Sequence, residues 1–365
     1  MIRHMPKPLQ LAYLVAVDLC RGDEASSVAV RKFQGYYPPQ LPATYEPRPL
    51  PGFTPLAELD TERHMPADET ELAIEGAAAS GDRSALTSLL AATWGDWDRR
   101  SRVAHRIANA AVEDESWLQA WEVAEPGSPG VTLVRAERTV LHAWKVRGAR
   151  RAKYLDEDQI RGFREGIALA EHHMEQAVAA APEDPTPLQF TMPVAMGRGW
   201  SREAFEGLWK EFATRHPHGF HGHLAALQYW CAKWRGSHEQ ARAFAAAAAA
   251  NASEGSFLAV LPLIAAFEEH GIEGARAYRT PQVHAAVEAC LLEVKTGPDA
   301  DPDIVFQVRH LLAYFLNRLG RHREAAEQFK AIDGHIGALP WTYCPNPPQE
   351  YGWYRRDSVR RSGRR

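Results

Sequence analysis

The sequence predicts an all-α protein in which antiparallel helix pairs stack into an irregular right-handed α-solenoid. Apolar residues recur at spacings of three and four over most of residues 66–336, which is typical of amphipathic helices. No alternating run of Val, Ile and Thr is paired with a hairpin turn signal, so we expect no sheet. A glycine is followed five residues later by an alanine, and then by a large apolar residue, in three places: Gly199–Ala204–Leu208, Gly236–Ala241–Phe244 and Gly320–Ala325–Phe329. We interpret each as a tight turn between closely packed helices.

Residues 1–65 are expected to form an N-terminal segment that ends in a proline-rich extended arm. Residues 8–34 have room for one or two short helices, whereas residues 38–55 contain seven prolines. Proline fixes φ and removes a backbone donor, so a helix or central strand is excluded there. The neighbouring aromatics, among them Tyr45 and Phe53, favour an arm packed on the body over a free linker.

The compartment is predicted from the N-terminus and the cysteines. An apolar run over residues 9–17 follows Arg3 and Lys7 but has no small-residue cleavage site after it, so we expect no secretory signal. No stretch reaches the roughly 20 apolar residues of a membrane span. The four cysteines form no C-x-x-C pair, which favours the cytoplasm.

An N-terminal helical region is predicted over residues 66–183. Asp68 is a suitable cap for a first helix through residue 79. The apolar periodicity then predicts helices over residues 83–92, 97–112, 131–146 and 156–181.

Helix pairs become clearer in residues 184–339. The expected pairs are 186–197 with 201–214, 220–235 with 237–251, a truncated pair 255–270 with 272–279, and 303–319 with 322–333; a single helix is expected at 281–295. Residues 245–250 are six consecutive alanines, which we interpret as a helix face that packs closely on a neighbour.

The last pair resembles a tetratricopeptide repeat, a helix pair of about 34 residues with apolar residues at fixed positions. Leu312, Ala313, Leu316, Gly320, Ala325 and Phe329 fall on those positions. Arg309 stands at the usual first tryptophan position and Gly337 at the usual closing proline. Residues 233–237 (KWRGS) are similar to an element of bacterial tetratricopeptide-like proteins. The three glycines lie 37 and 84 residues apart, so the array is irregular.

The resemblance implies a binding groove, because the first helix of each pair faces the concave surface in that family. The implied groove residues are Gln307, His310, Tyr314, Asn317 and Arg318 in the last pair, and His223, Trp230, Lys233 and Trp234 in the 220–251 pair. Aromatic faces beside cationic and amide donors suit peptide segments or carboxylate termini. The alternative is that Trp230 and Trp234 pack between repeats.

A histidine cluster supports a second hypothesis, a metal-binding protein or enzyme. His216, His218, His221 and His223 fall within eight residues, and neutral imidazoles bind divalent metals. The stretch is a loop between helix pairs and lacks the H-x-x-x-H spacing of helical sites, so loop histidines are the simpler interpretation. Walker, G-x-G-x-x-G and G-x-S-x-G motifs are absent, and we therefore predict no cofactor and no catalytic residue.

The C-terminus supports a third hypothesis, a nucleic-acid-associated regulator. Residues 355–365 contain six arginines and one aspartate, and basic tails attract nucleic acid. Such an end is more often a disordered tail. Residues 340–354, rich in aromatics and proline, are expected to fold back on the last repeat. The net charge of −4 gives no global case for nucleic acid or membrane partners.

The resulting prediction is a cytoplasmic bacterial scaffold or adaptor that holds a peptide or protein segment on the concave face of its helical repeats. Whether the protein is an enzyme is left open, with a non-enzymatic role favoured, and no membrane partner is expected. The oligomeric state is not predicted.

Overall fold

The computed structural model describes residues 50–148, 155–271, 276–297, 300–344 and 346–363. These residues form fifteen α-helices and three short 3₁₀ helices, and the ranges just given contain no strand, only an isolated bridge between Asp60 and His335. The all-α prediction is confirmed. Within the described residues, no helix combines the length and the apolar character needed to cross a bilayer.

The chain divides into two compact units. Residues 67–244 form one, which we call the central unit, and residues 1–66 together with 245–365 form the other, the terminal unit. The boundary falls within helix α12 (His238–Ala250). In that helix Ala241, Ala245 and Ala248 are buried, so the predicted packing face of the alanine run is confirmed.

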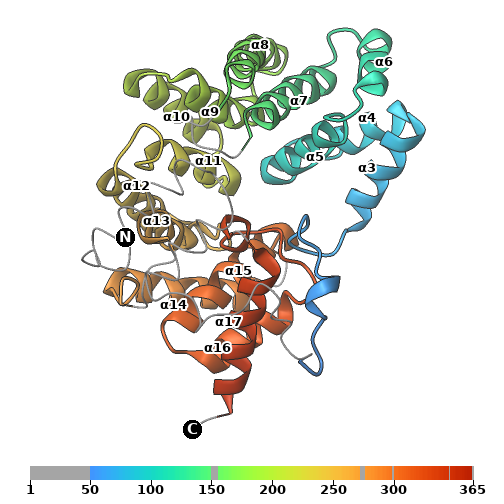
Figure 1. Ribbon diagram of the computed structural model, residues 1–365. Coiled ribbons are helices and arrows are strands. Elements are labelled where there is room, and N and C mark those ends of the chain that lie inside the picture. The colour runs from blue at the N-terminus through green and yellow to red at the C-terminus, as the bar shows by residue number, and fades with distance from the viewer. Residues whose placement is uncertain (1–49, 149–154, 272–275, 298–299, 345, 364–365) are drawn as a thin grey trace. The chain divides into compact units, whose positions relative to one another are not determined.

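Successive helices of the central unit pack against one another (Figure 1). They are α3 (Glu69–Ser80), α4 (Arg83–Ala91), α5 (Trp97–Ala110), α6 (Ser116–Ala124), α7 (Pro129–Arg147), α8 (Glu157–Ala180), α9 (Thr186–Arg198), α10 (Arg202–Arg215) and α11 (Phe220–Trp230). Asp68, Asp82, Asp96 and Asp156 cap four of them by accepting main-chain N–H bonds. One apolar core joins α3 to α9 and a second joins α9 to α11. Helix α6 was not predicted.

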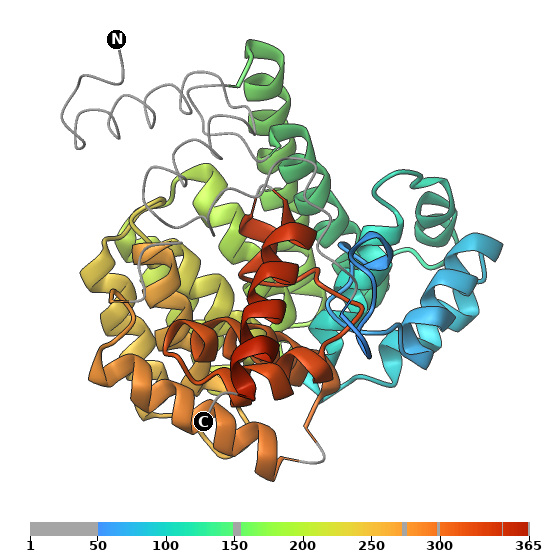
Figure 2. The same cartoon turned by 60° about the horizontal axis from the view of Figure 1, so that its bottom comes forward.

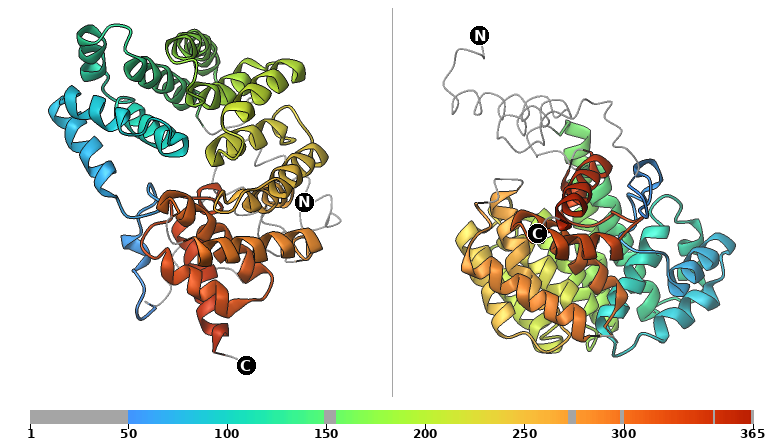
Figure 3. Two further views of the ribbon diagram at one scale, coloured as in Figure 1. Left: turned by 180° about the vertical axis from the view of Figure 1, so that it is seen from behind. Right: turned by 90° about the horizontal axis from the view of Figure 1, so that it is seen from below.

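The terminal unit places the C-terminal helix on the last helix pair. Its elements are η2 (Leu56–Glu58), η4 (Leu258–Val260), α13 (Leu261–His270), α14 (Pro281–Thr296), α15 (Pro302–Arg318), α16 (His322–Ala331), η5 (Trp341–Tyr343) and α17 (Pro347–Ser362). Helix α15 packs against α14 and α16, as Figure 3 also shows from behind. Helix α17, red in Figure 2, packs against both α15 and α16.

The repeated glycines serve two different purposes. Gly199 and Gly320 have φ of +71° and +81°, the left-handed conformation that a turn after a helix needs. Gly236 allows close approach instead, because a Cβ atom there would lie 1.9 Å from the main-chain oxygen of Trp230. The sequence pattern therefore located three real turns.

The alanine of the pattern is a packing residue in only two copies. Ala241 and Ala325 are buried, whereas Ala204 is exposed and Phe205 occupies the buried position. Helices α12 and α16 begin two residues after their glycines, but α10 begins three residues after Gly199. One extra turn residue rotates the helix register by about 100°. The packing role predicted for Ala204 is therefore wrong.

Helix α11 is shorter than predicted. It ends at Trp230, and residues 231–235 form a compact turn in which Arg235 N donates to Tyr229 O and Gly236 N to Cys231 O. Trp230 and Trp234 are therefore not one helical turn apart, because Trp234 belongs to the turn.

The segment after residue 340 folds back on the last pair, as predicted, and continues as a regular helix to Ser362. The basic stretch 355–362 is thus part of α17 and not a disordered tail. Asn346 caps this helix and prolines occupy its first turn, a start signal that the sequence contained.

Within the terminal unit, residues 50–66 pack against the segment that follows α16. Asp60 exchanges main-chain hydrogen bonds with Gly334 and Ile336, and Gly337 N donates to Arg63 O. The helices expected in residues 8–34 and the proline-rich stretch 38–49 lie outside the described residues. So do residues 272–275 of the expected helix 272–279, whose residues 276–278 form a turn.

Candidate functional site

His310, one of the implied groove residues, lies in the interior of the terminal unit. Its Nε2 atom is 2.9 Å from the main-chain oxygen of His64, and its Nδ1 atom is 3.0 Å from the indole nitrogen of Trp341. Burial lowers the pKa of His310 to about 3, so the ring is neutral. Both nitrogens are used by the protein itself.

Helix α17 and η5 cover the same face of α15. Tyr314 is buried among the rings of Tyr278, Trp341 and Tyr354. Asn317 donates to the hydroxyl of Ser358 at 2.9 Å, and the guanidinium of Arg318 lies 6.0 Å from the ring centre of Tyr354. This face of α15, which the sequence implied as a groove, is covered here by α17 and η5.

Gln307 is partly buried and donates to the Asp303 carboxylate, 2.7 Å away. It stands one turn before the covered residues and is committed to a contact within its own helix.

The implied groove residues of the 220–251 pair lie in the central unit and do not share a face. Trp230 is buried against Phe205 and Tyr229. His223 is buried and bonds to Gly219 O, and burial lowers its pKa. Trp234 meets Trp144 edge to face at 5.4 Å, with Arg147 over its ring, and Lys233 is exposed. For Trp230, the structure agrees with the core-packing alternative.

The histidine loop is organised around a carboxylate from another helix. Asp98 of α5 bonds to His216 Nε2 at 3.1 Å and accepts from the main-chain nitrogens of Phe220 and His221, each at 3.3 Å. It thereby caps the start of α11. Burial alone would raise the pKa of Asp98, but the His216 hydrogen bond, the nearby His221 and this main-chain bond lower it overall.

The described residues of the histidine loop do not form a set of metal ligands. Among the described residues, no group of three or more His, Cys, Asp or Glu side chains is placed to hold a metal ion. The Nδ1 atom of His218 is buried without a hydrogen-bond partner, but a single imidazole does not make a site. His216, His221 and His223 take part in the hydrogen bonds at the start of α11.

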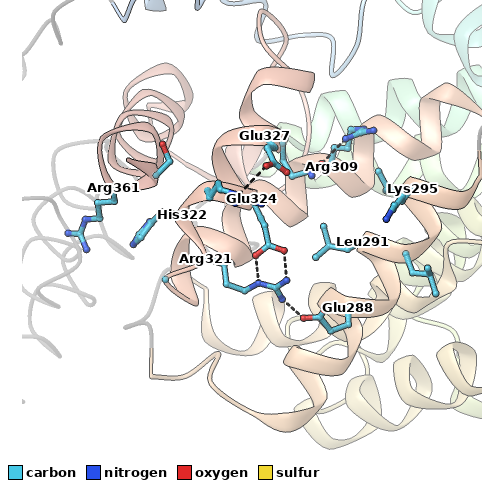
Figure 4. A pocket seen from close by; sticks show the side chains of 15 residues that line it. Glu288, Leu291, Lys295, Arg309, Arg321, His322, Glu324, Glu327 and Arg361 are labelled. Carbon is cyan, nitrogen blue, oxygen red and sulfur yellow. Dashed lines mark hydrogen bonds and ion pairs between the residues drawn. The ribbon is translucent and has the colours of Figure 1, made fainter. Parts of the chain in front are cut away.

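The terminal unit contains an open groove lined by α14, α15, α16 and the end of α17, with a volume of about 980 Å³ (Figure 4). Leu291, Leu292 and Val294 of α14 supply its apolar part, and Leu292 is 61% exposed. Five cationic side chains line it against three glutamates: Lys295, Arg309, Arg321, Arg323 and Arg361 against Glu288, Glu324 and Glu327.

Three of the five cations have carboxylate partners. Arg321 pairs with Glu324 and Glu288, as the dashed lines of Figure 4 mark, and the Glu324 hydrogen bond raises its pKa. Arg323 Nε is 3.6 Å from Glu327, and Arg361 Nε is 2.8 Å from Asp357. These pairs neutralise much of the groove but not all of it.

Arg309 and Lys295 pair with no carboxylate in the part of the chain that the structure describes. The guanidinium of Arg309 is partly buried and donates to the neutral amide of Gln328 at 2.8 Å. Burial lowers its pKa, although an arginine stays charged in a protein. The groove therefore holds a partly desolvated cation beside an exposed lysine and an apolar strip.

Sequence reasoning missed this groove, although a signal was present. Arg309 is the residue that departs from the tetratricopeptide pattern at the first tryptophan position. A charged residue at a position that is usually apolar was that signal, but its hydrogen bond to Gln328 of α16 could not be read from spacing. The basic tail contributes Arg361 here, while Arg355 is buried against Asp333 and Thr54.

No protein-family model, curated protein or solved structure matches this chain.

Proposed function

We propose that this protein is a peptide-binding adaptor whose terminal unit takes an acidic, partly apolar segment of a partner protein in the groove between α14 and α16. The observation that carries the proposal is Arg309, a partly buried guanidinium whose only hydrogen-bond acceptor among the described residues is an amide. A ligand carboxylate would form the charge-assisted, bidentate pair that no described residue of the chain supplies to Arg309.

The composition of the groove supports this choice of ligand. Leu291 and Leu292 of α14 offer an apolar surface for one or two side chains. Lys295, also on α14, adds a positive charge to that of Arg309 on α15. A segment in which leucine or phenylalanine alternates with glutamate or aspartate would match both features. The volume also lies within the range of ligand pockets, about 300–1,000 Å³.

The finer expectations from the sequence belong to the same proposal. In it, the helix pairs form a right-handed tetratricopeptide-like solenoid, the proline-rich stretch is an arm of that solenoid, and the protein acts as a scaffold in a bacterial cytoplasm. The proposal moves the ligand away from the first-helix face of α15, because α17 covers that face.

The test is fluorescence anisotropy with a labelled amphipathic peptide of leucine and glutamate, here called the Leu–Glu peptide. A charged hydrogen bond contributes about 1.5–3 kcal/mol, so Arg309→Gln should weaken binding on the order of 10- to 100-fold. Lys295→Gln removes an exposed charge and should weaken it about 2- to 5-fold.

Arg161→Gln is the matched control, since Arg161 is an exposed arginine on α8 that does not line the groove. Circular dichroism verifies that each variant is folded. Equal affinity of wild type and Arg309→Gln for the Leu–Glu peptide, or no binding by the wild type, would overturn the proposal.

A further inference from the structure

A second groove lies in the central unit between α8, α9 and α10, with a volume of about 360 Å³. Helix α8 lines it with Glu171, Met174, Glu175 and Val178, which stand at i, i+3, i+4 and i+7. This spacing is one helix face, about 10 Å long at 1.5 Å per residue. The groove is therefore long enough for two turns of a ligand helix.

The floor of this groove is apolar. Met174, Val178, Leu188 and Leu208 meet there from three helices. Trp200 also lines it, and its indole nitrogen donates to Glu171 Oε1 at 2.8 Å. Because this bond satisfies the polar atom of Trp200 and holds the ring in place, the ring is a preorganised surface for contact.

Every charged side chain that lines the groove is a glutamate. Glu171 is committed to Arg198 and Trp200, and Glu211 pairs with Arg215. Glu175 is 75% exposed, and its one ionic partner among the residues that the structure describes is His172, at 4.0 Å. The surrounding residues, 157–215, contain ten Asp and Glu residues against six Lys and Arg residues. The rim is thus negative where the groove of the terminal unit is positive.

We propose that this groove binds a basic amphipathic helix of a partner protein, with apolar side chains on the Met174–Val178 floor and a lysine or arginine between Glu175 and the Trp200 ring. An amphipathic helix in an apolar groove is a recurrent mode of peptide recognition, and a cation over a tryptophan ring adds to it. The protein then bridges two partners of opposite charge, one on each unit.

The inference is tested with the Leu–Glu peptide and a matched peptide in which lysine replaces glutamate, the Leu–Lys peptide. Glu175→Lys should weaken binding of the Leu–Lys peptide on the order of 3- to 10-fold, because it turns an attraction into a repulsion. Glu165→Lys is the control: it makes the same charge change on the same helix, at an exposed residue that does not line the groove.

The two peptides separate this inference from the proposed function. Glu175→Lys should not weaken binding of the Leu–Glu peptide, and Arg309→Gln should not weaken binding of the Leu–Lys peptide. Failure of the Leu–Lys peptide to bind the wild type overturns the second groove alone. Equal losses for Glu175→Lys and Glu165→Lys do so too, because the attraction would then be one of net charge only.

Discussion

The buried imidazole of His310 donates from Nε2 to the main-chain oxygen of His64, 2.9 Å away and 246 residues earlier in the chain. The tautomer follows from Trp341, whose indole nitrogen can only donate and therefore requires an unprotonated Nδ1 in His310. This neutral ring joins α15 to the segment 50–66 and to η5.

His310 should make the terminal unit sensitive to acid. Its folded pKa is about 3 and its usual value is 6.5, so the unfolded state binds a proton first. The contribution of neutral His310 to the free energy of unfolding is present above pH 6.5 and is lost as the pH falls towards 3. Urea unfolding should show that the free energy of unfolding of the wild type falls between pH 7 and pH 4. In His310→Gln this fall should be smaller by up to a few kcal/mol. An unchanged pH slope in the variant, with exposed His172→Gln as control, would contradict this.

Arg355 should be a structural residue despite its place in a basic stretch. It is buried, pairs with Asp333 at 2.6 Å and donates to Thr54 O at 2.9 Å. Arg355→Ala leaves the Asp333 carboxylate without this partner and should lower the free energy of unfolding by about 3–5 kcal/mol. Arg360→Ala, at an exposed position of the same helix, should change it by less than about 0.5 kcal/mol. Thermal denaturation of both variants measures the difference, and similar midpoints would refute the assignment.

Gly236 should not tolerate a side chain. A Cβ atom at this position would lie 1.9 Å from Trp230 O, so Gly236→Ala must displace backbone in the turn after α11. We expect a loss of more than about 2 kcal/mol in unfolding free energy. Gly207→Ala is the matched control, because Gly207 lies within α10 with no atom near its Cβ position, and alanine there should stabilise the helix by about 0.5–1 kcal/mol. Chemical denaturation should therefore show a decrease in unfolding free energy for Gly236→Ala and an increase for Gly207→Ala.

Asp98 should stabilise the histidine loop without any metal. Asp98→Asn removes the charged acceptor that His216 and the first turn of α11 share, and should cost about 1–3 kcal/mol. Zinc or nickel should not raise the melting temperature of the wild type, since the described histidines belong to no group of three or more possible metal ligands. A rise that His218→Ala or His221→Ala abolishes would restore the metal hypothesis.

The sequence by itself determined the class of fold and most of the helices. Apolar periodicity and caps such as Asp68, Asp156 and Ser201 are local signals, because each acts on the residues of its own first turn. The turns at Gly199 and Gly320 were equally readable, since a left-handed residue after a helix favours glycine.

Only the tertiary structure decided which helix faces remain open. Tyr314 and Asn317 of α15, which a groove would present, are covered by α17, and Trp234 lies in the turn that follows Trp230. Arg309, which departs from the repeat pattern, instead lines an open groove. Burial and charge pairing depend on partners distant in the chain, such as His64 for His310, and a periodic pattern carries no information about those partners.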